Sequence, residues 1–174
     1  MSKDIRDDEP ALHVQYLSTI ITFEMDDLFD PFTVLSANSH LPGYSHQMFP
    51  RLQDLLKRFW IITAANPLSE EHSKAQNAAL NEKLQKDLNQ LGLKYEPVTC
   101  TSADGKWTEH SFAVSRQDNL KSQEVENLII ALAGKYLQNS VFSFSGNIMK
   151  ILPVLRPDIK GQANYYVYEP TSRY

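Results

Sequence analysis

The chain has 174 residues, of which 42% are hydrophobic and 22% charged, and its formal net charge at pH 7 is −4. This composition is ordinary for one globular domain, and the acidic balance without a Lys/Arg-rich run argues against nucleic acid as the main partner. No apolar stretch approaches the length needed to span a bilayer, and the polar N-terminus lacks a signal-peptide pattern. We therefore expect a cytoplasmic protein without a membrane partner, with a flexible tail over residues 1–9 and a single domain over residues 10–174.

The first third of the chain predicts short elements. A short helix is expected over residues 10–17, and the β-branched and aromatic side chains of residues 18–25 favour a strand. Residues 32–38 are a second strand candidate, and the Pro-Gly pair in residues 40–46 indicates a loop. Leucines at helical spacing predict a helix across residues 46–59.

The middle of the chain has the most regular patterns. Residues 60–65 (WIITAA) contain almost no polar side chain, which is typical of a central strand covered on both faces. The strand should end before Pro67, because the residue preceding a proline is disfavoured in helical geometry. The longest helix is expected over residues 69–91, with Ser69 as its N-cap and Gly92 as its C-terminal stop.

The second half predicts two hairpins, a helix and a terminal strand. Strand-like residues 94–102 and 106–115 flank Ala-Asp-Gly, and Ser-Gly-Asn interrupts a second pair of strands within residues 140–154. A helix with one apolar stripe is expected at about 122–137, and a short strand at 165–168. The order of elements predicts an α+β fold in which about three helices pack on a mixed or largely antiparallel sheet.

Polar side chains lie on the face of the long helix that should be buried. At about 100° per residue, one face carries Ser73, Asn77, Asn81, Leu84, Leu88 and Leu91. Because the leucines are expected in the core, the polar residues should also point inward, nearer the start of the helix. Burying an amide without partners costs roughly 1 to 3 kcal/mol, so these amides need hydrogen-bond partners or a polar pocket.

Two interpretations of these amides stay open. In the structural one, Asn77 and Asn81 bind backbone groups of neighbouring loops and brace the corner at Pro67. In the functional one, they line a polar ligand pocket beside the N-terminus of the helix, where free N–H groups favour anions and polar groups. Thr63 and Asn66, at the end of the preceding strand, would then add donors to the same pocket.

Two further stretches supply polar candidates. Alternation along residues 107–114 puts Glu109 and Ser111 on one face of a strand. Glu109 is the one obvious acid or base, although a solvated carboxylate on an exposed face explains the pattern equally well. Gln138 follows the second long helix and is a candidate for an inward polar side chain, while Asn139 is expected to cap that helix.

The sequence contains no motif that names a reaction. Cys100 is the only cysteine, which excludes an internal disulfide and a multi-cysteine metal site. The five histidines show no pair at metal-ligand spacing, and neither a Gly-rich phosphate loop nor a nucleophile elbow occurs. We expect no metal and no cofactor, and the sequence leaves open whether the protein is an enzyme.

Several short motifs follow one another along the chain in an order that is typical of a known family. They are a strand that ends in Thr-Ala-x-Asn-Pro, an asparagine-bearing helix, a Glu-x-Ser strand and a glutamine near a late strand. In this chain the motif residues are Thr63, Ala64, Asn66, Pro67, Asn77 or Asn81, Glu109, Ser111 and Gln138. Over about residues 58–152 the chain resembles an uncharacterised bacterial family, domain of unknown function 3293. The resemblance implies a shared polar constellation and no particular chemistry; where the family often has a Gly-rich stretch, this chain has SADGKW.

The polar residues support two hypotheses about function. The first is a pocket for a small nucleotide- or sugar-like ligand, with Glu109 as the catalytic candidate. Its ligand-binding candidates are Thr63, Asn66, Ser73, Asn77, Asn81, Ser111 and Gln138. The second is a non-catalytic interaction or regulatory protein, whose inward polar residues are structural and whose Tyr-rich residues 164–174 contact a protein partner. The same tyrosines also suit an ordinary packed terminal strand.

Overall fold

The computed structural model describes residues 16–23, 32–36, 44–45, 58–115, 117 and 119–170. The strands are β1 (Ile20–Phe23), β2 (Phe32–Ser36), β3 (Tyr44–Ser45), β4 (Arg58–Ile62), β5 (Tyr95–Thr101), β6 (Thr108–Ser115), β7 (Ser140–Ser145), β8 (Ile148–Pro153) and β9 (Gly161–Pro170). The helices are the 3-10 helix η1 (Pro67–Ser69) and the α-helices α3 (Lys74–Gln90) and α4 (Ser122–Lys135). The predicted tail over residues 1–9 lies outside the described residues.

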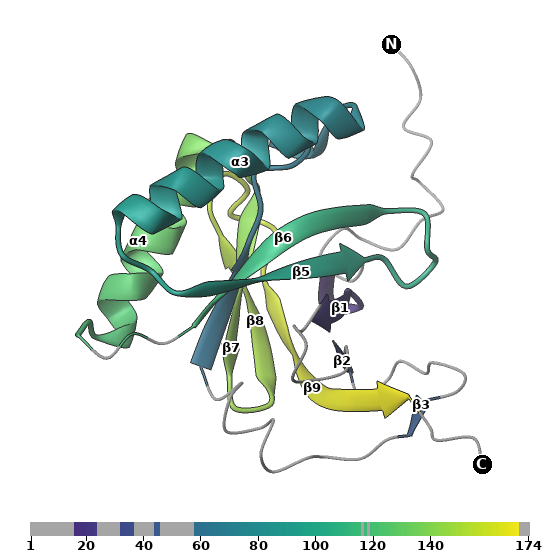
Figure 1. Ribbon diagram of the computed structural model, residues 1–174. Coiled ribbons are helices and arrows are strands. Elements are labelled where there is room, and N and C mark those ends of the chain that lie inside the picture. The colour runs from purple at the N-terminus through teal and green to yellow at the C-terminus, as the bar shows by residue number, and fades with distance from the viewer. Residues whose placement is uncertain are drawn as a thin grey trace.

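The strands form one curled sheet. Their order is β2-β1-β5-β6-β4-β7-β8-β9-β3, and the described pairings are antiparallel. The long strand β9 pairs with β8 through its first half, as in Ile148 with Asn164, and with β2 through its second half, as in Val34 with Val167. Because β2 is the first strand in the order and β9 the last but one, this second pairing curls the sheet back on its first strand (Figure 1).

This architecture agrees with the predicted α+β class and the predicted antiparallel sheet. The predicted number of helices was wrong. Among the described residues there are two α-helices, α3 and α4, instead of about three. The helix expected across residues 46–59 falls mostly outside the described residues. Its last two residues, Arg58 and Phe59, begin β4 instead, and Phe59 stacks on Phe144 of the neighbouring strand at 4.2 Å between ring centroids.

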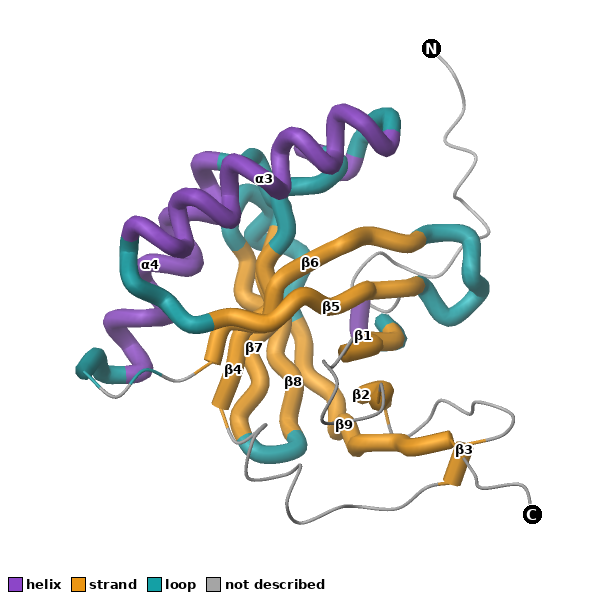
Figure 2. Tube along the Cα trace, in the orientation of Figure 1, coloured by secondary structure: helices purple, strands orange, loops and turns teal. Residues whose placement is uncertain are grey.

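Strand β4 is central, as its apolar run predicts. It pairs with β6 along one edge and with β7 along the other. Its alternate side chains enter two separate cores: Trp60 and Ile62 pack under the helices, while Phe59 and Ile61 pack inside the curl of the sheet. Both helices lie on the same side of the sheet (Figure 2), so the concave side holds its own core.

Polar contacts fix the helices to the sheet and to each other. Glu126 of α4 accepts hydrogen bonds from Trp60 Nε1 and Arg58 Nη2, both at 3.1 Å. Asp87 of α3 accepts from Lys135 Nζ at 2.8 Å and from Tyr136 Oη at 2.6 Å, both at the end of α4. The helices therefore have a defined rotation, which sets the face that α3 turns toward β4.

The long helix begins later than predicted. Ser73 is its N-cap: Ser73 Oγ accepts from the Gln76 N–H at 3.1 Å, and the Gln76 side chain accepts from the Ser73 N–H at 3.0 Å. The prediction of Ser69 as N-cap was wrong, because Ser69 lies in η1. Capping also keeps Ser73 exposed at the helix end, so Ser73 is not turned inward with the asparagines.

The inward face of α3 is shorter than the helical spacing suggests. Asn81, Leu84 and Leu88 are buried, whereas Leu91 is 42% exposed. The helix ends at Gln90, and Gly92 takes a positive φ of 70° that turns the chain away, which confirms Gly92 as the stop. The expectation that Leu91 lies in the core was wrong.

Both predicted hairpins are present, as β5–β6 and β7–β8. After α4, however, Leu137 adopts the left-handed conformation at a φ of 55°, so Asn139 is not the cap of this helix. The terminal strand β9 is longer than predicted. Its Tyr165 is 1% exposed and donates to the backbone oxygens of Leu17 and Thr19, so this tyrosine belongs to the core and not to an interaction surface.

The two leucines near the end of α3 give a direct test of this packing. Replacing the fully buried Leu88 by alanine should lower the free energy of unfolding by about 2–5 kcal/mol, because a cavity is left in the core. Replacing Leu91 should change it by about 0.5 kcal/mol or less. Urea denaturation of the two variants measures both; equal losses would mean that Leu91 is buried after all.

Candidate functional site

The chain turns sharply after β4 at a corner formed by residues 63–69. Asn66, Leu68 and Ser69 have positive φ angles of 49°, 59° and 58°. Residues other than glycine occupy this region at a cost of order 1 kcal/mol or more each, and they do so only where their surroundings hold them. The corner is thus strained, and its neighbours must stabilise it.

Asn81 supplies the first of these supports. The register that pairs Ile62 with Phe112 would continue with Thr63 opposite Ser111 and then Ala64 opposite His110. Between Ala64 and His110, however, lies the side-chain amide of Asn81. Asn81 Oδ1 accepts from the Ala64 N–H at 2.9 Å, and Asn81 Nδ2 donates to His110 O at 3.0 Å. The amide therefore takes the place of a strand pair, and β4 and β6 part at this point.

Asn77 and Gln138 support the rest of the corner. Asn77 Oδ1 accepts from the Asn66 N–H at 2.8 Å, and Asn77 Nδ2 donates to Asn66 Oδ1 at 3.0 Å. Gln138 is buried and points inward, as predicted, and its Nε2 donates to Ala65 O at 3.0 Å. These hydrogen bonds match the structural interpretation of the inward amides, since their partners belong to the corner itself.

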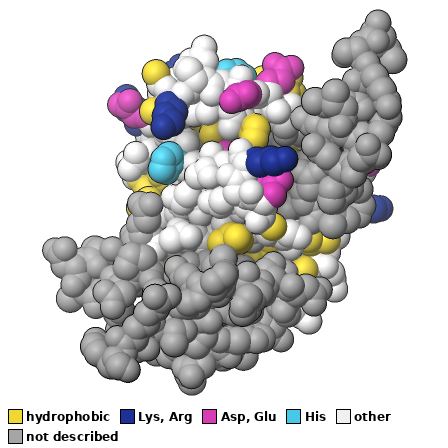
Figure 3. All heavy atoms as spheres, turned by 90° about the vertical axis from the view of Figure 1, so that its right-hand side faces the viewer, with side chains coloured by type: hydrophobic (Ala, Val, Ile, Leu, Met, Phe, Trp, Pro, Cys, Tyr) yellow, Lys and Arg dark blue, Asp and Glu magenta, His cyan; other side chains and the backbone are white. Residues whose placement is uncertain are grey.

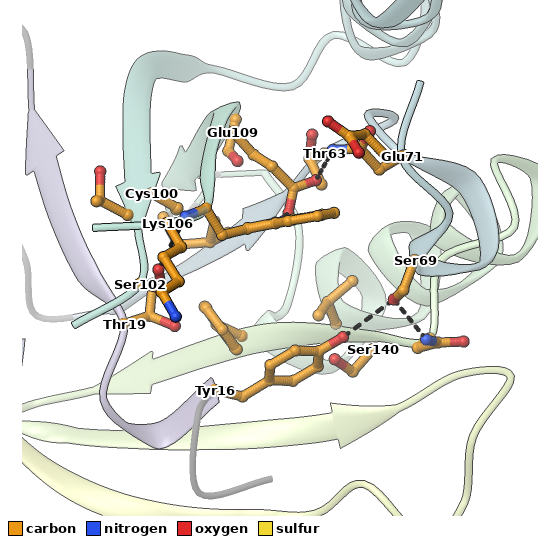
Figure 4. A pocket seen from close by; sticks show the side chains of 18 of the residues that line it. Tyr16, Thr19, Thr63, Ser69, Glu71, Cys100, Ser102, Lys106, Glu109 and Ser140 are labelled. Carbon is orange, nitrogen blue, oxygen red and sulfur yellow. Dashed lines mark hydrogen bonds between the residues drawn. The ribbon is translucent and has the colours of Figure 1, made fainter. Parts of the chain in front are cut away.

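A cleft of about 590 Å³ opens beside the corner. It includes Ile61, Ser111 and Phe142, which face the concave side of the sheet, so the cleft lies on the face opposite the helices. Among its polar lining residues are Tyr16, Thr63, Asn66, Ser69, Glu71, Ser102, Asp104, Lys106, Trp107, Glu109, Ser111, Asn139 and Ser140. Figure 4 shows Glu109, Thr63 and Glu71 along one wall and Tyr16 and Ser140 along the other.

Glu109 is the central group of the first wall. Its Oε1 accepts from Trp107 Nε1 at 2.6 Å, and its Oε2 accepts from Asn66 Nδ2 at 3.3 Å. Burial in the cleft raises the pKa of the Glu109 carboxyl above its ordinary value of 4.5, and these two hydrogen bonds offset part of the rise. The carboxyl is thereby held in a fixed orientation, with no cationic partner among the described residues.

A second polar group lies at the opposite wall. Ser69 Oγ accepts from Asn139 Nδ2 at 2.7 Å and lies 3.3 Å from the Tyr16 hydroxyl (Figure 4). Ser69 makes these contacts from the strained corner, where its φ is 58°. Tyr16, Ser69 and Asn139 come from three distant parts of the chain and meet only because the sheet curls.

The cysteine in the cleft is not an activated nucleophile. Cys100 lies directly across the β5–β6 pair from Glu109. Burial raises the pKa of the Cys100 thiol to about 12, and the nearby Glu109 charge adds to the rise, whereas a reactive thiolate needs a lowered pKa. Among the residues that the structure describes, no group of three or more His, Cys, Asp or Glu side chains is arranged to hold a metal ion.

The structure brings together four of the predicted site residues and separates the others from them. Thr63, Asn66, Glu109 and Ser111 all line the cleft. Asn77, Asn81 and Gln138 lie behind it in the corner, and Ser73 is exposed at the start of α3. Among the lining residues that the sequence did not single out for the site are Tyr16, Ser69, Lys106, Trp107 and Asn139.

The fold is an antiparallel α+β arrangement with a polar cleft on the concave face of its sheet. Residues 62–141 match the model of a protein family of unknown function, DUF3293, which confirms the resemblance found in the sequence. The matched segment contains the corner, Asn77 and Asn81 of α3, and the Glu-x-Ser strand. No curated protein and no solved structure matches the chain. Within the described residues, neither α-helix is long and apolar enough to cross a membrane.

Removing the Asn81 amide tests the support of the corner. Asn81→Ala leaves the buried Ala64 N–H without its acceptor, so the free energy of unfolding should fall by about 1–3 kcal/mol. Gln85→Ala, at an exposed position of the same helix, is the matched control and should change it by about 0.5 kcal/mol or less. Similar losses in the two variants would show that the amide does not support the corner.

The pH dependence of stability tests the environment of Glu109. A carboxyl whose pKa is raised on folding favours the folded state below its unfolded value of 4.5, and this contribution is lost as pH rises through the folded pKa. The stability of the wild type relative to Glu109→Gln should therefore fall as pH rises from the unfolded value of 4.5 through the raised folded pKa. Denaturant unfolding across this range measures it, with the exposed Glu82→Gln as control; a pH-independent difference for Glu109→Gln would contradict the desolvated carboxyl.

Proposed function

We propose that the cleft binds a small polar ligand and that Glu109 is its main recognition group. The observation that carries the proposal is a carboxylate fixed by Trp107 and Asn66 in the wall of a 590 Å³ cleft. Small-molecule sites typically measure roughly 300 to 1,000 Å³ and combine apolar walls with a few precisely placed polar groups. Ile61 and Phe142 supply apolar wall here, so both parts of that description are met.

The hydrogen-bond capacity of Glu109 supports this role. An ionised carboxylate has about four acceptor positions, and Trp107 and Asn66 occupy one on each oxygen. The remaining positions are poorly solvated in the cleft, which is why the pKa of this carboxyl is raised. A ligand hydroxyl or amine that donates to Glu109 would replace the water lost on folding, and this gain favours binding.

A proton-transfer role is the chemistry that Glu109 can add to binding. A general acid or base works best when its pKa lies near the working pH, and the shift of the Glu109 pKa is upward, toward neutrality. No second activated group accompanies it among the described lining residues, because the Cys100 thiol is held neutral. The proposal is therefore a binding site first, with Glu109 as its one candidate for catalysis.

The alternative of a protein partner at the Tyr-rich C-terminus has less support. Tyr165 is buried and hydrogen-bonded to the backbone, so it offers no contact area. The same hypothesis also holds that the inward polar residues are structural. This agrees with Asn77, Asn81 and Gln138, whose side chains bind groups of the corner. A structural corner and a ligand cleft are compatible, because different residues form them.

A metabolite screen tests the proposal. At a ligand concentration of about 100 times Kd, binding should stabilise the protein by about 2.7 kcal/mol, which a thermal-shift assay detects as a raised Tm. For any compound found, Glu109→Gln should weaken the affinity about 10- to 100-fold in calorimetry, because a hydrogen bond to a charged group is lost. Glu82→Gln on the exposed face of α3 is the control. Unchanged affinity in Glu109→Gln would remove Glu109 from the site.

A further inference from the structure

The charged groups that line the cleft are mostly acidic. Glu71, Asp104 and Glu109 contribute carboxylates and Lys106 the one ammonium group, and the described lining includes no arginine. Asp104 accepts from Ser102 Oγ at 2.6 Å and from the Lys106 N–H at 3.0 Å, so the pKa of its carboxyl is lowered and it stays ionised. On the face shown in Figure 3, the described Lys and Arg side chains lie among acidic ones and do not gather into a patch. An anionic ligand would meet net repulsion.

The start of α3 does not compensate for this repulsion. A helix N-terminus binds phosphate through its free N–H groups, but here the capping box and Asn66 occupy several N–H groups at and just before the helix start. The Gln76 N–H donates to Ser73 Oγ, the Asn77 N–H to Ser73 O, and the nearby His72 N–H to Asn66 Oδ1. Residues from Ser73 onward in α3 also do not line the cleft. The expected anion site at this helix end is therefore not formed.

The neutral groups of the cleft match a ring that carries hydroxyls. Trp107 is 36% exposed at the cleft, and its Nε1–H bond to Glu109 fixes the plane of the indole. A fixed aromatic face packs well against the apolar face of a sugar ring. Across the cleft, the Tyr16–Ser69–Asn139 chain offers hydroxyl and amide groups, which both donate to and accept from ligand hydroxyls.

We infer that the ligand of this cleft is a sugar-like polyhydroxyl compound without phosphate, stacked on Trp107 and bound by Glu109. This inference rests on the proposed function and narrows it, since it selects the sugar-like over the nucleotide-like ligand. A primary amine on the same scaffold strengthens binding, because it meets the acidic lining. A phosphate ester weakens it for the same reason.

Matched sets of compounds test the inference. Each set contains a hexose or pentose, its amino sugar and its phosphate ester, together with a ribonucleoside and its monophosphate. Binding is measured by saturation-transfer NMR and calorimetry at low and at moderate NaCl concentration. The phosphate ester should bind at least tenfold more weakly than its parent sugar, and the penalty should shrink with added salt, because salt screens partly exposed charges.

Variants test separately the repulsion of phosphate by the acidic lining and the stacking of the sugar ring on Trp107. Glu71→Gln should raise the affinity for the phosphate ester relative to the parent sugar several-fold, whereas Glu82→Gln, outside the cleft, should leave this ratio unchanged. Trp107→Leu should weaken the parent sugar more than Trp107→Phe, which keeps an aromatic face. A phosphate ester that binds as tightly as its parent sugar would overturn the inference and leave the proposed site standing. Absence of binding by every compound, here and in the metabolite screen, would count against both.

Discussion

The Asn81 amide between β4 and β6 is the interaction on which the shape of the site depends. The pairing of β4 with β6 ends at Ile62 and Phe112, and Thr63 and Asn66, which follow in the chain, line the cleft. A side-chain amide carries one acceptor and two donors, so it can satisfy the Ala64 N–H and the His110 carbonyl while the strands separate. The buried Ala64 N–H therefore keeps a partner although the strand pairing has ended, as a buried backbone donor requires.

Asn66 connects this support to the cleft. Its backbone N–H and side-chain oxygen are held by Asn77, and its Oδ1 also accepts from the His72 N–H. With its oxygen occupied in this way, the Asn66 amide presents its Nδ2 to Glu109. The orientation of Glu109 is thus set by an asparagine whose own left-handed backbone is fixed by α3. The contacts between Asn77 and Asn66 therefore both hold the strained corner and fix the orientation of Glu109 in the cleft.

Local periodicity explains what the sequence predicted correctly. The alternation of β6 placed Glu109 and Ser111 on one face, and the Asn-Pro break placed Thr63 and Asn66 at the end of a central strand. The start of α3 was predictable as well, because Ser73 and Gln76 have the spacing of a capping box. Ser69 has His72 three residues later and therefore lacks the Glu or Gln partner of a capping box.

The opposite wall of the cleft, formed by Tyr16, Ser69 and Asn139, could not be predicted from any local sequence pattern. Tyr16 reaches Ser69 across 53 residues of chain, and Asn139 reaches it across 70; these contacts exist only after the sheet has curled. The inward orientation of Asn77 and Asn81 was predicted correctly, but it fits two roles. At the same helical position, an inward amide can bind a backbone group or line a pocket. Only the positions of Ala64 and His110 decide between them.

The two tryptophans lie in opposite surroundings, and this gives the protein a built-in optical reporter. Trp60 is fully buried under the helices, with its Nε1–H on Glu126 and the Arg58 guanidinium 4.2 Å from its ring. Trp107 is partly exposed at the cleft. Fluorescence from the first follows the packing of the core, whereas emission from the second senses water and solutes at the mouth of the cleft. One spectrum therefore distinguishes events at the cleft from loss of the fold.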